Sequence, residues 1–263
     1  MGVKFATTGI TKMYFGSNQI SSVYFGTTQV FGGGGSFTPL YVALTTGTSY
    51  TVPTGATSMK AWVVGPGSSG YQISFTLYPG SAGGVAYKTY TVSGGNSITY
   101  SIGVRDSSNT TLTYGGVTIT GNRGNQGTGG SFSGGDGGAT GGTGGSTGNY
   151  PYASIGGSIN CSVDLYGNSG PYGNETCFVS SPCYRGDPAD VDGLFSAASS
   201  AGLNVTEGCV DTNPPLGAGG ACAKDYSAKR AGYGGGGCGP ASLYGGVAPY
   251  TYGGGGVIVL AFT

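Results

Sequence analysis

Short segments of apolar or alternating residues, separated by turns rich in Gly, Asn and Ser, run through the first half of the chain. Alternation over so few positions predicts half-buried β-strands. These strands are predicted at 49–53, 59–64, 88–92, 97–102, 111–114 and 117–120. The segment VIVLAF at 257–262 is apolar throughout, and it therefore predicts a central strand that is buried on both faces.

The segment 190–201 is the one short helix candidate, so the predicted class is all-β, with the strands forming a sandwich or jelly roll. A buried final strand has to pair with strands that precede Gly121. Both ends of the segment 121–252 are then expected to return to the same sheet. The sequence thus predicts a β-sandwich body of residues 37–120 and 253–263, with a long insertion at 121–252.

Three copies of a ten-residue pattern occupy the first thirty residues: VKFATTGI at 3–10, MYFGSNQI at 13–20 and VYFGTTQV at 23–30. This spacing fits one strand and one turn per copy, arranged as a β-meander. The string FGGGGS at 31–36 fits a short flexible joint, so residues 1–36 are predicted as a separate module. Two roles stay open for it: an edge sheet on the following domain, or a docking module that attaches the chain to a larger assembly or trimerises it.

Glycine supplies 59 of the 263 residues, and the insertion carries the longest tract, GGDGGATGGTGGSTG at 134–148. A polyproline-II-type helix has three residues per turn. When the tract 124–149 is divided into three rows at that spacing, two rows are almost all Gly or small residues and the third is polar. This pattern predicts left-handed glycine helices that pack side by side through lateral hydrogen bonds, with 217–221, 234–239 and 253–256 as neighbours. A disordered low-complexity loop is the alternative.

Charge and the absence of His narrow the function. Lys and Arg number 10, Asp and Glu also number 10, and charged residues make up 8% of the chain. A neutral chain of this kind lacks the positive surface that binds nucleic acid or anionic lipid. Without His there is no Ser-His-Asp or Cys-His nucleophile system and no His-ligated zinc, so we expect neither an enzyme nor a cofactor. No apolar run has the length of a membrane helix, and the start of the chain lacks the pattern of a secretory signal.

All 6 cysteines lie in the insertion, with irregular spacing and no C-x-x-C pair. This arrangement disfavours zinc and predicts disulfide-stapled loops of undetermined connectivity, with reduced buried thiols as the alternative. The candidates are Cys161, Cys177, Cys183, Cys209, Cys222 and Cys238. The string GDPADVDG at 186–193 also places Asp187, Asp190 and Asp192 close together. It predicts a solvated acidic turn or, less favoured because the distal Glu of an EF-hand loop is missing, a calcium site.

Tyrosines crowd the second half of the chain. Tyr gives rigid, amphipathic contact area at low entropic cost, and its ring stacks on sugar rings, so these side chains are candidates for receptor binding. The alternative is structural, with Tyr covering the backbone of neighbouring Gly. The candidates are Tyr150, Tyr152, Tyr166, Tyr172, Tyr184, Tyr226, Tyr233, Tyr244 and Tyr250, with Tyr252 beside them.

The strings YTVPTGATSMKAWVVGPGSSG, TYTVSGGNSITYSIG and LTYGGVTITGNRGNQGTGG, with GGGGVIVLAFT at the end, resemble the glycine-rich domain of bacteriophage tail-fibre and tail-tip proteins. The Tyr-Phe-Gly-[Ser/Thr] repeats are similar to those at the start of small phage structural proteins. Glycine helices that carry variable loops are similar to the distal adhesins of T-even-like phages. The segment 160–238, which holds every Cys, departs from these patterns.

This resemblance implies a virion protein of the phage tail, made in the host cytoplasm, that recognises the host surface without catalysis. It implies a homotrimer that binds other virion proteins through the N-terminal repeats and a surface glycan or outer-membrane receptor through the insertion. No nucleic-acid partner and no membrane insertion are expected. Two alternatives stay open: a capsid decoration or baseplate protein with no receptor, and a secreted ice- or matrix-binding glycine-helix protein.

Overall fold

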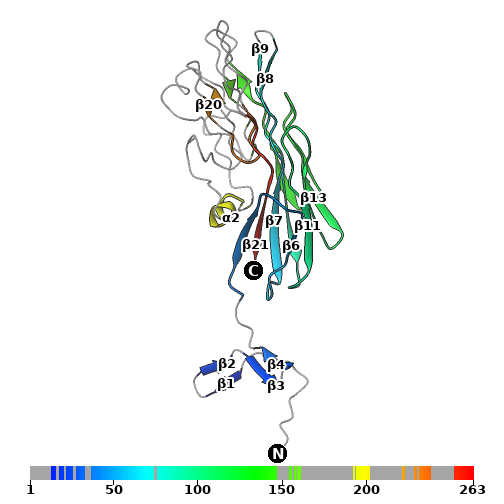
Figure 1. Cartoon of the computed structure of the whole chain (residues 1–263), viewed down its shortest axis with the longest axis vertical. Helices are drawn as coiled ribbons and strands as arrows, with labels where there is room; N and C mark the ends of the chain where they lie inside the picture. The colour runs from blue at the N-terminus through cyan, green and yellow to red at the C-terminus, as the bar shows by residue number, and fades with distance from the viewer. Residues whose placement is uncertain are drawn as a thin grey trace, which may run out of the picture. The chain divides into compact units, whose positions relative to one another are not determined.

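The chain forms two compact units, Met1–Pro39 with Thr263, and Leu40–Phe262 (Figure 1). The structure is a computed structural model. It describes residues 13–15, 18–20, 22–25, 28–32, 37–73, 76–146, 154–155, 157, 159–160, 192, 194–201, 221–222, 228–229, 231–237 and 252–263.

In the first unit, each described copy of the ten-residue repeat is a β-hairpin. Strand β1 (Met13–Phe15) pairs with β2 (Asn18–Ile20), and β3 (Ser22–Phe25) pairs with β4 (Thr28–Gly32), all antiparallel. The sequence predicted one strand per copy, and this is wrong because two residues are enough to reverse the chain inside each copy. The copy at 3–10 lies outside the described residues.

The second unit is built on two antiparallel sheets, which confirms the all-β class. The six-stranded sheet has the order β18-β15-β10-β7-β21-β5, and the five-stranded sheet has the order β14-β13-β12-β11-β6 (Figure 1). The first comprises β5 (Leu40–Leu44), β7 (Ser58–Val64), β10 (Val85–Thr91), β15 (Gly137–Gly141), β18 (Ile159–Asn160) and β21 (Val257–Phe262). The second comprises β6 (Ser49–Thr51), β11 (Ser97–Ser101), β12 (Thr110–Tyr114), β13 (Val117–Gly121) and β14 (Phe132–Ser133).

Smaller elements complete this unit. Strands β8 (Tyr71–Ile73) and β9 (Thr76–Tyr78) form a hairpin. A four-stranded sheet joins β16 (Gly145–Ser146), β17 (Ser154–Ile155), β19 (Ala221–Cys222) and β20 (Ala228–Lys229). Helix α2 (Leu194–Ser200) falls inside the predicted segment 190–201. Among the residues that the structure describes, no helix has the length and apolar character needed to span a membrane.

The last strand is central, as its apolar run predicts. Strand β21 pairs with β7 on one side and with β5 on the other, so it does return to strands that precede Gly121. On one face, Ile258, Leu260 and Phe262 are fully buried, and the Phe262 ring stacks on Tyr50 of β6 at 5.9 Å between centroids. This face therefore packs on the five-stranded sheet.

The opposite face of β21 is covered by helix α2. Val257 and Val259 are buried there in one cluster with Trp62 of β7 and with Leu194 and Ala198 of α2. A strand with a layer on each face loses the usual alternation of apolar and polar residues. This double burial explains why the segment 257–262 carries no polar residue.

Candidate functional site

Strands β7, β10 and β21 have neighbouring ends at one edge of the six-stranded sheet, and a glycine-rich segment adjoins each of these ends. Val64, Val85 and Val257 are register partners, and the segments 65–68, 80–84 and 253–256 extend the chain beyond them. These segments join others like them in a set that we call the glycine bundle. The glycine bundle comprises 65–68, 80–84, 121–124, 129–131, 141–142, 157, 232–237 and 253–256.

The centre of the glycine bundle is the segment 80–84. A β-strand has hydrogen-bonded neighbours on two sides only. By contrast, the backbone of 80–84 bonds to 65–68, 121–124, 129–131, 141–142, 157 and 232–237. For example, Gly80 donates to the carbonyl of Gly237 at 2.7 Å, and Gly84 donates to that of Asn122 at 2.9 Å. The bonding therefore extends in three dimensions, whereas a sheet bonds only within its own plane.

The lateral bonds repeat every three residues. The N–H groups of Gly80 and Gly83 both donate to the segment 232–237, and those of Gly65 and Ser68 both donate to 80–84. A period of three is that of a polyproline-II-type chain, which has no hydrogen bonds of its own and takes its partners from neighbours. Lateral bonding between glycine-rich segments is thus present, but within the glycine bundle the bonds of the described part of the tract 124–149 go to 65–68, 80–84 and 121–124 and not to the described residues of the predicted neighbours 234–239 and 253–256.

The predicted shape of the tract 124–149 differs from the observed one. The tract does not run as one three-row helix, because it turns at Gly127 and Gly134, where φ is 72° and 75°. Between and after these turns it contributes β14 and β15 to the two sheets. Residues 147–149 lie outside the described part of the chain.

At many glycines of the glycine bundle, the approach of a neighbouring backbone leaves no room for a side chain. A Cβ atom at Gly65 would collide with the carbonyl of Asn122, and one at Gly83 with the carbonyl of Gly65. Stacked sheets normally lie about 10 Å apart because side chains fill the space between them. Here the segments that extend the two sheets bond to each other directly. Gly84, which precedes β10, donates to Asn122, which follows β13, and Gly256, which precedes β21, donates to Gly103 after β11 at 3.0 Å.

Two connections leave this scaffold within the described residues. The hairpin β8–β9 follows 65–68 and precedes 80–84, and the rings of Tyr71 and Tyr78 stack at its base with centroids 4.7 Å apart. The side chain of Tyr78 is exposed. Figure 1 shows β8 and β9 at the end of the unit opposite the C-terminus of β21.

The second connection is the loop 103–109, whose residues 104–109 are all exposed. It is bound on several sides. Asp106 accepts hydrogen bonds at both carboxylate oxygens, from the N–H of Ser69 at 2.9 Å and from its hydroxyl at 2.6 Å. Arg123 donates to the carbonyl of Asp106 at 2.7 Å, and the N–H of Val104 donates to the Ser108 hydroxyl at 3.0 Å. The loop is therefore an ordered surface beside the glycine bundle.

This loop presents a cation on an aromatic ring. The guanidinium carbon of Arg105 lies 3.9 Å from the ring centroid of Tyr252, the residue that precedes 253–256. Tyr252 is 53% exposed and the neighbouring Val104 is 60% exposed. Sequence reasoning named Tyr252 but not Val104 or Arg105, and only folding brings positions so distant in the chain together.

The tyrosine candidates fall mostly outside the described residues. Tyr233 is described, and it is exposed in a turn before Gly234, which has a φ of 76°. The other candidates are not placed: Tyr150, Tyr152, Tyr166, Tyr172, Tyr184, Tyr226, Tyr244 and Tyr250. Cys222 lies in β19 opposite Ala228, and the five remaining cysteines are outside the described ranges, so their oxidation state stays a prediction.

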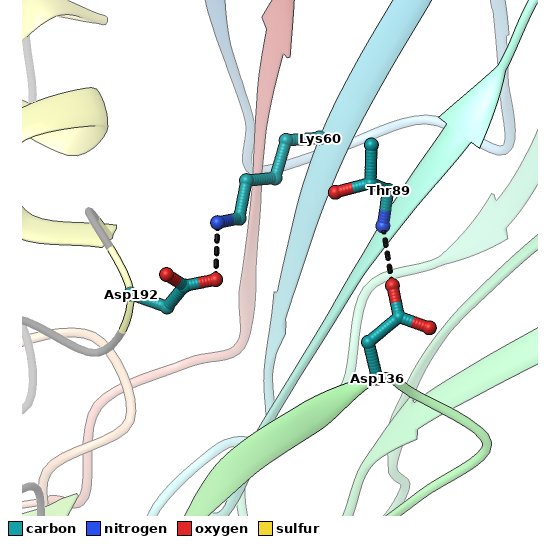
Figure 2. A network of polar contacts seen from close by, with 4 residues as sticks. All are labelled: Lys60, Thr89, Asp136 and Asp192. Atoms are coloured by element: carbon teal, nitrogen blue, oxygen red, sulfur yellow. Dashed lines mark hydrogen bonds and ion pairs between the residues drawn. The ribbon is translucent and has the colours of Figure 1, made fainter.

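Of the three carboxylates in the acidic string, the structure describes Asp192, which forms an ion pair with Lys60 of β7 (Figure 2). The Lys60 ammonium also lies over the rings of Trp62 and Tyr87, at 5.4 and 5.1 Å from their centroids. In the described part of the chain, no group of three potential metal ligands occurs. Asp187 and Asp190 are not described, so a calcium site there stays a prediction.

Asp136 fixes the turn between β14 and β15 onto β10. Its carboxylate accepts a hydrogen bond from the Lys88 ammonium at 2.6 Å. It accepts another from the N–H of Thr89 at 2.9 Å, which Figure 2 shows. The Lys88 bond first, and then the Thr89 bond, hold the pKa of Asp136 below its usual range. Both ion pairs thus hold peripheral segments against the six-stranded sheet.

A comparison of the chain with protein-family models and with curated proteins gives no match. The functional assignment therefore rests on the geometry above and on the resemblance of sequence strings.

Proposed function

We propose that this chain is a non-enzymatic bacteriophage virion protein, a tail-fibre or tail-tip component that recognises the host cell surface. The observation that carries the proposal is the glycine bundle, whose backbone bonds to neighbours in three dimensions. We interpret it as a polyglycine-II-like scaffold that holds the loops of the insertion above a β-sandwich body. Binding residues are commonly placed on loops that a rigid framework positions.

The surface chemistry supports a neutral mode of recognition. The chain has no net charge, and the described aromatic side chains beyond the sheets include the exposed Tyr78, Tyr233 and Tyr252. Such side chains suit a surface glycan or the loops of an outer-membrane protein. In this proposal, the N-terminal hairpins attach the protein to other virion proteins, and three copies assemble into one fibre tip.

Competition for adsorption tests this function. Purified protein, added to host cells before the phage, is expected to block adsorption in a saturable way. Deletion of 161–191, which spares helix α2 and the segment 232–237 of the glycine bundle, should abolish the block. Deletion of the hairpins at 13–32 should leave the block intact while preventing incorporation into particles. Circular dichroism and thermal unfolding of both variants establish that the rest of the chain is folded.

Each outcome is decisive. A deletion of 161–191 that still blocks adsorption would place the receptor site elsewhere. Full-length protein that does not block adsorption, combined with antibody labelling on the phage head, would identify a decoration protein and overturn the proposal.

A further inference from the structure

We propose that Val104, Arg105 and Tyr252 form a binding site for a sugar that carries an oxyanion, such as a phosphorylated or carboxylated saccharide. This inference names a ligand class for the proposed surface recognition and rests on it. The site lies beside the glycine bundle and uses a loop outside the insertion.

The first argument is the state of the Arg105 guanidinium. Its carbon lies 3.9 Å from the centroid of the Tyr252 ring, and a guanidinium that stacks on a ring face keeps its N–H edges for other partners. Among the described residues, none accepts a hydrogen bond from it, and the two ion pairs found there involve Lys60 and Lys88. The nearby Asp106 is already bound through both carboxylate oxygens to Ser69.

The second argument is preorganisation. The base of the loop is fixed where Gly256 donates to the carbonyl of Gly103 at 3.0 Å, and its far end where Asn109 accepts from the N–H of Arg123 at 2.9 Å. Asp106, between them, holds a φ of 58°, a value that is uncommon for a residue other than Gly. Strained backbone of this kind tends to occur at ligand sites.

The third argument is the combination of groups. A planar guanidinium binds carboxylate or phosphate through two parallel hydrogen bonds. The exposed Val104 side chain and the Tyr252 ring provide apolar area beside it, which suits the C–H face of a sugar. A bare anion would use Arg105 alone, whereas a charged sugar would use all three side chains.

Nuclear magnetic resonance of the full chain tests the site with glucose 6-phosphate, glucose and inorganic phosphate as probes. We expect glucose 6-phosphate to shift the Tyr252 ring signals and the Arg105 Nε–H signal saturably, with affinity at least about tenfold above either other probe, or about 1.4 kcal/mol. Arg105→Lys, which keeps the charge but loses the planar fork, should weaken binding by about the same factor. Lys88→Gln, which removes a positive charge elsewhere, should leave binding unchanged.

Several results would overturn the proposal: equal binding of inorganic phosphate, unchanged binding by Arg105→Lys, or no shift with any probe. If the Arg105→Lys variant unfolds, Tyr252→Leu provides the second variant. Unchanged binding of glucose 6-phosphate by that variant would also overturn the proposal. Adsorption competition separates this inference from the proposed function. Protein that blocks adsorption but ignores glucose 6-phosphate overturns this site alone, whereas protein that binds the sugar phosphate but never blocks adsorption overturns the proposed function alone.

Discussion

The strand layers and the glycine bundle occupy one continuous unit, yet they exclude water in opposite ways. In the strand layers, the space between two sheets is filled by side chains such as Leu112, Ile258 and Phe262, which are all fully buried. In the glycine bundle most residues are Gly, and the segments approach until their backbones bond directly. The first region is stabilised mainly by apolar burial and the second by hydrogen bonds and close packing.

The difference explains why the bundle is built onto the sheets. Ordering Gly costs more conformational entropy than ordering any other residue, so glycine segments alone are poorly stable. Here Val64, Val85 and Val257 fix the starting positions of three segments in register. The strand layers thus reduce the entropic penalty of aligning the bundle, and we expect the bundle to depend on the strands more than the strands depend on it.

The largest predicted effect is in the strand layers. Phe262→Ala removes a fully buried ring that stacks on Tyr50, and we expect a loss of about 4 kcal/mol in the free energy of unfolding. Urea denaturation measures the loss. Hydrogen exchange should show faster exchange of Gly83 in the bundle together with Val259 in β21. Protection of Gly83 that survives this change would mean that the bundle is stable without the strands.

The next effect separates the bundle from the strands. Gly254→Ala places a Cβ against the carbonyl of Gly232. Because the backbone has to move, we expect the free energy of unfolding to fall by about 3 kcal/mol. The adjacent Gly255→Ala is the matched control, since no atom lies within 4 Å of the added Cβ and φ is not positive there. It should be neutral or more stable by about 0.5 kcal/mol. Equal losses at the two positions would contradict the packing argument.

A smaller effect concerns a polar group inside the strand layers. The Tyr90 hydroxyl is buried, and none of the described residues forms a hydrogen bond with it. Burial, together with the Asp136 charge, raises the pKa of Tyr90 to about 12. Tyr90→Phe should therefore raise the free energy of unfolding by up to about 1 kcal/mol. Because the folded pKa exceeds the unfolded one, wild-type stability should fall as pH rises from 10 to 12. The fall should be smaller in the variant, where the raised pKa of Tyr50, caused by burial, still contributes. Thermal unfolding across that pH range measures both effects.

The smallest effect is at low pH. The pKa of Asp136 is lower in the folded chain than its usual value. Its contribution to the free energy of unfolding is therefore present above about pH 3.9 and is lost as pH falls through the folded pKa. The group is largely solvent-accessible, which keeps the contribution small. Asp136→Asn should remove this part of the acid dependence, which a comparison of melting temperatures between pH 2 and pH 6 would detect. Identical pH profiles for the two proteins would contradict it.

Local pattern predicted the strands well where they have five or more residues and a defined apolar face. β7, β11, β12, β13 and β21 all overlap the predicted segments, and β10 begins three residues before its predicted start. β5 was not predicted, because its residues change gradually from exposed to buried without alternation. The hairpins of the repeat were misjudged because strands of three to five residues are too short to show a period of two.

The glycine bundle was largely not predictable. The spacing of three indicated lateral bonding for the tract 124–149, but the centre of the bundle is the unpredicted segment 80–84, because nothing in a run of Gly marks where the chain turns or which segment bonds to which. Those choices depend on strands far away in the sequence, as the bond between Gly83 and Gly234 shows. For the same reason, no local signal joined Arg105 to Tyr252.

The exclusion of Cβ atoms from the glycine bundle has a consequence for how such a protein evolves. Low-complexity glycine tracts ordinarily drift freely in composition and length. Here Gly65, Gly83 and Gly254 each face a carbonyl that leaves no room for a methyl group, so drift at these positions is blocked. The exposed residues of the loop 104–109 meet no such barrier, so their side chains can change more freely. The compositionally simplest part of the chain is thus expected to be its most conserved, and the complex part its most variable.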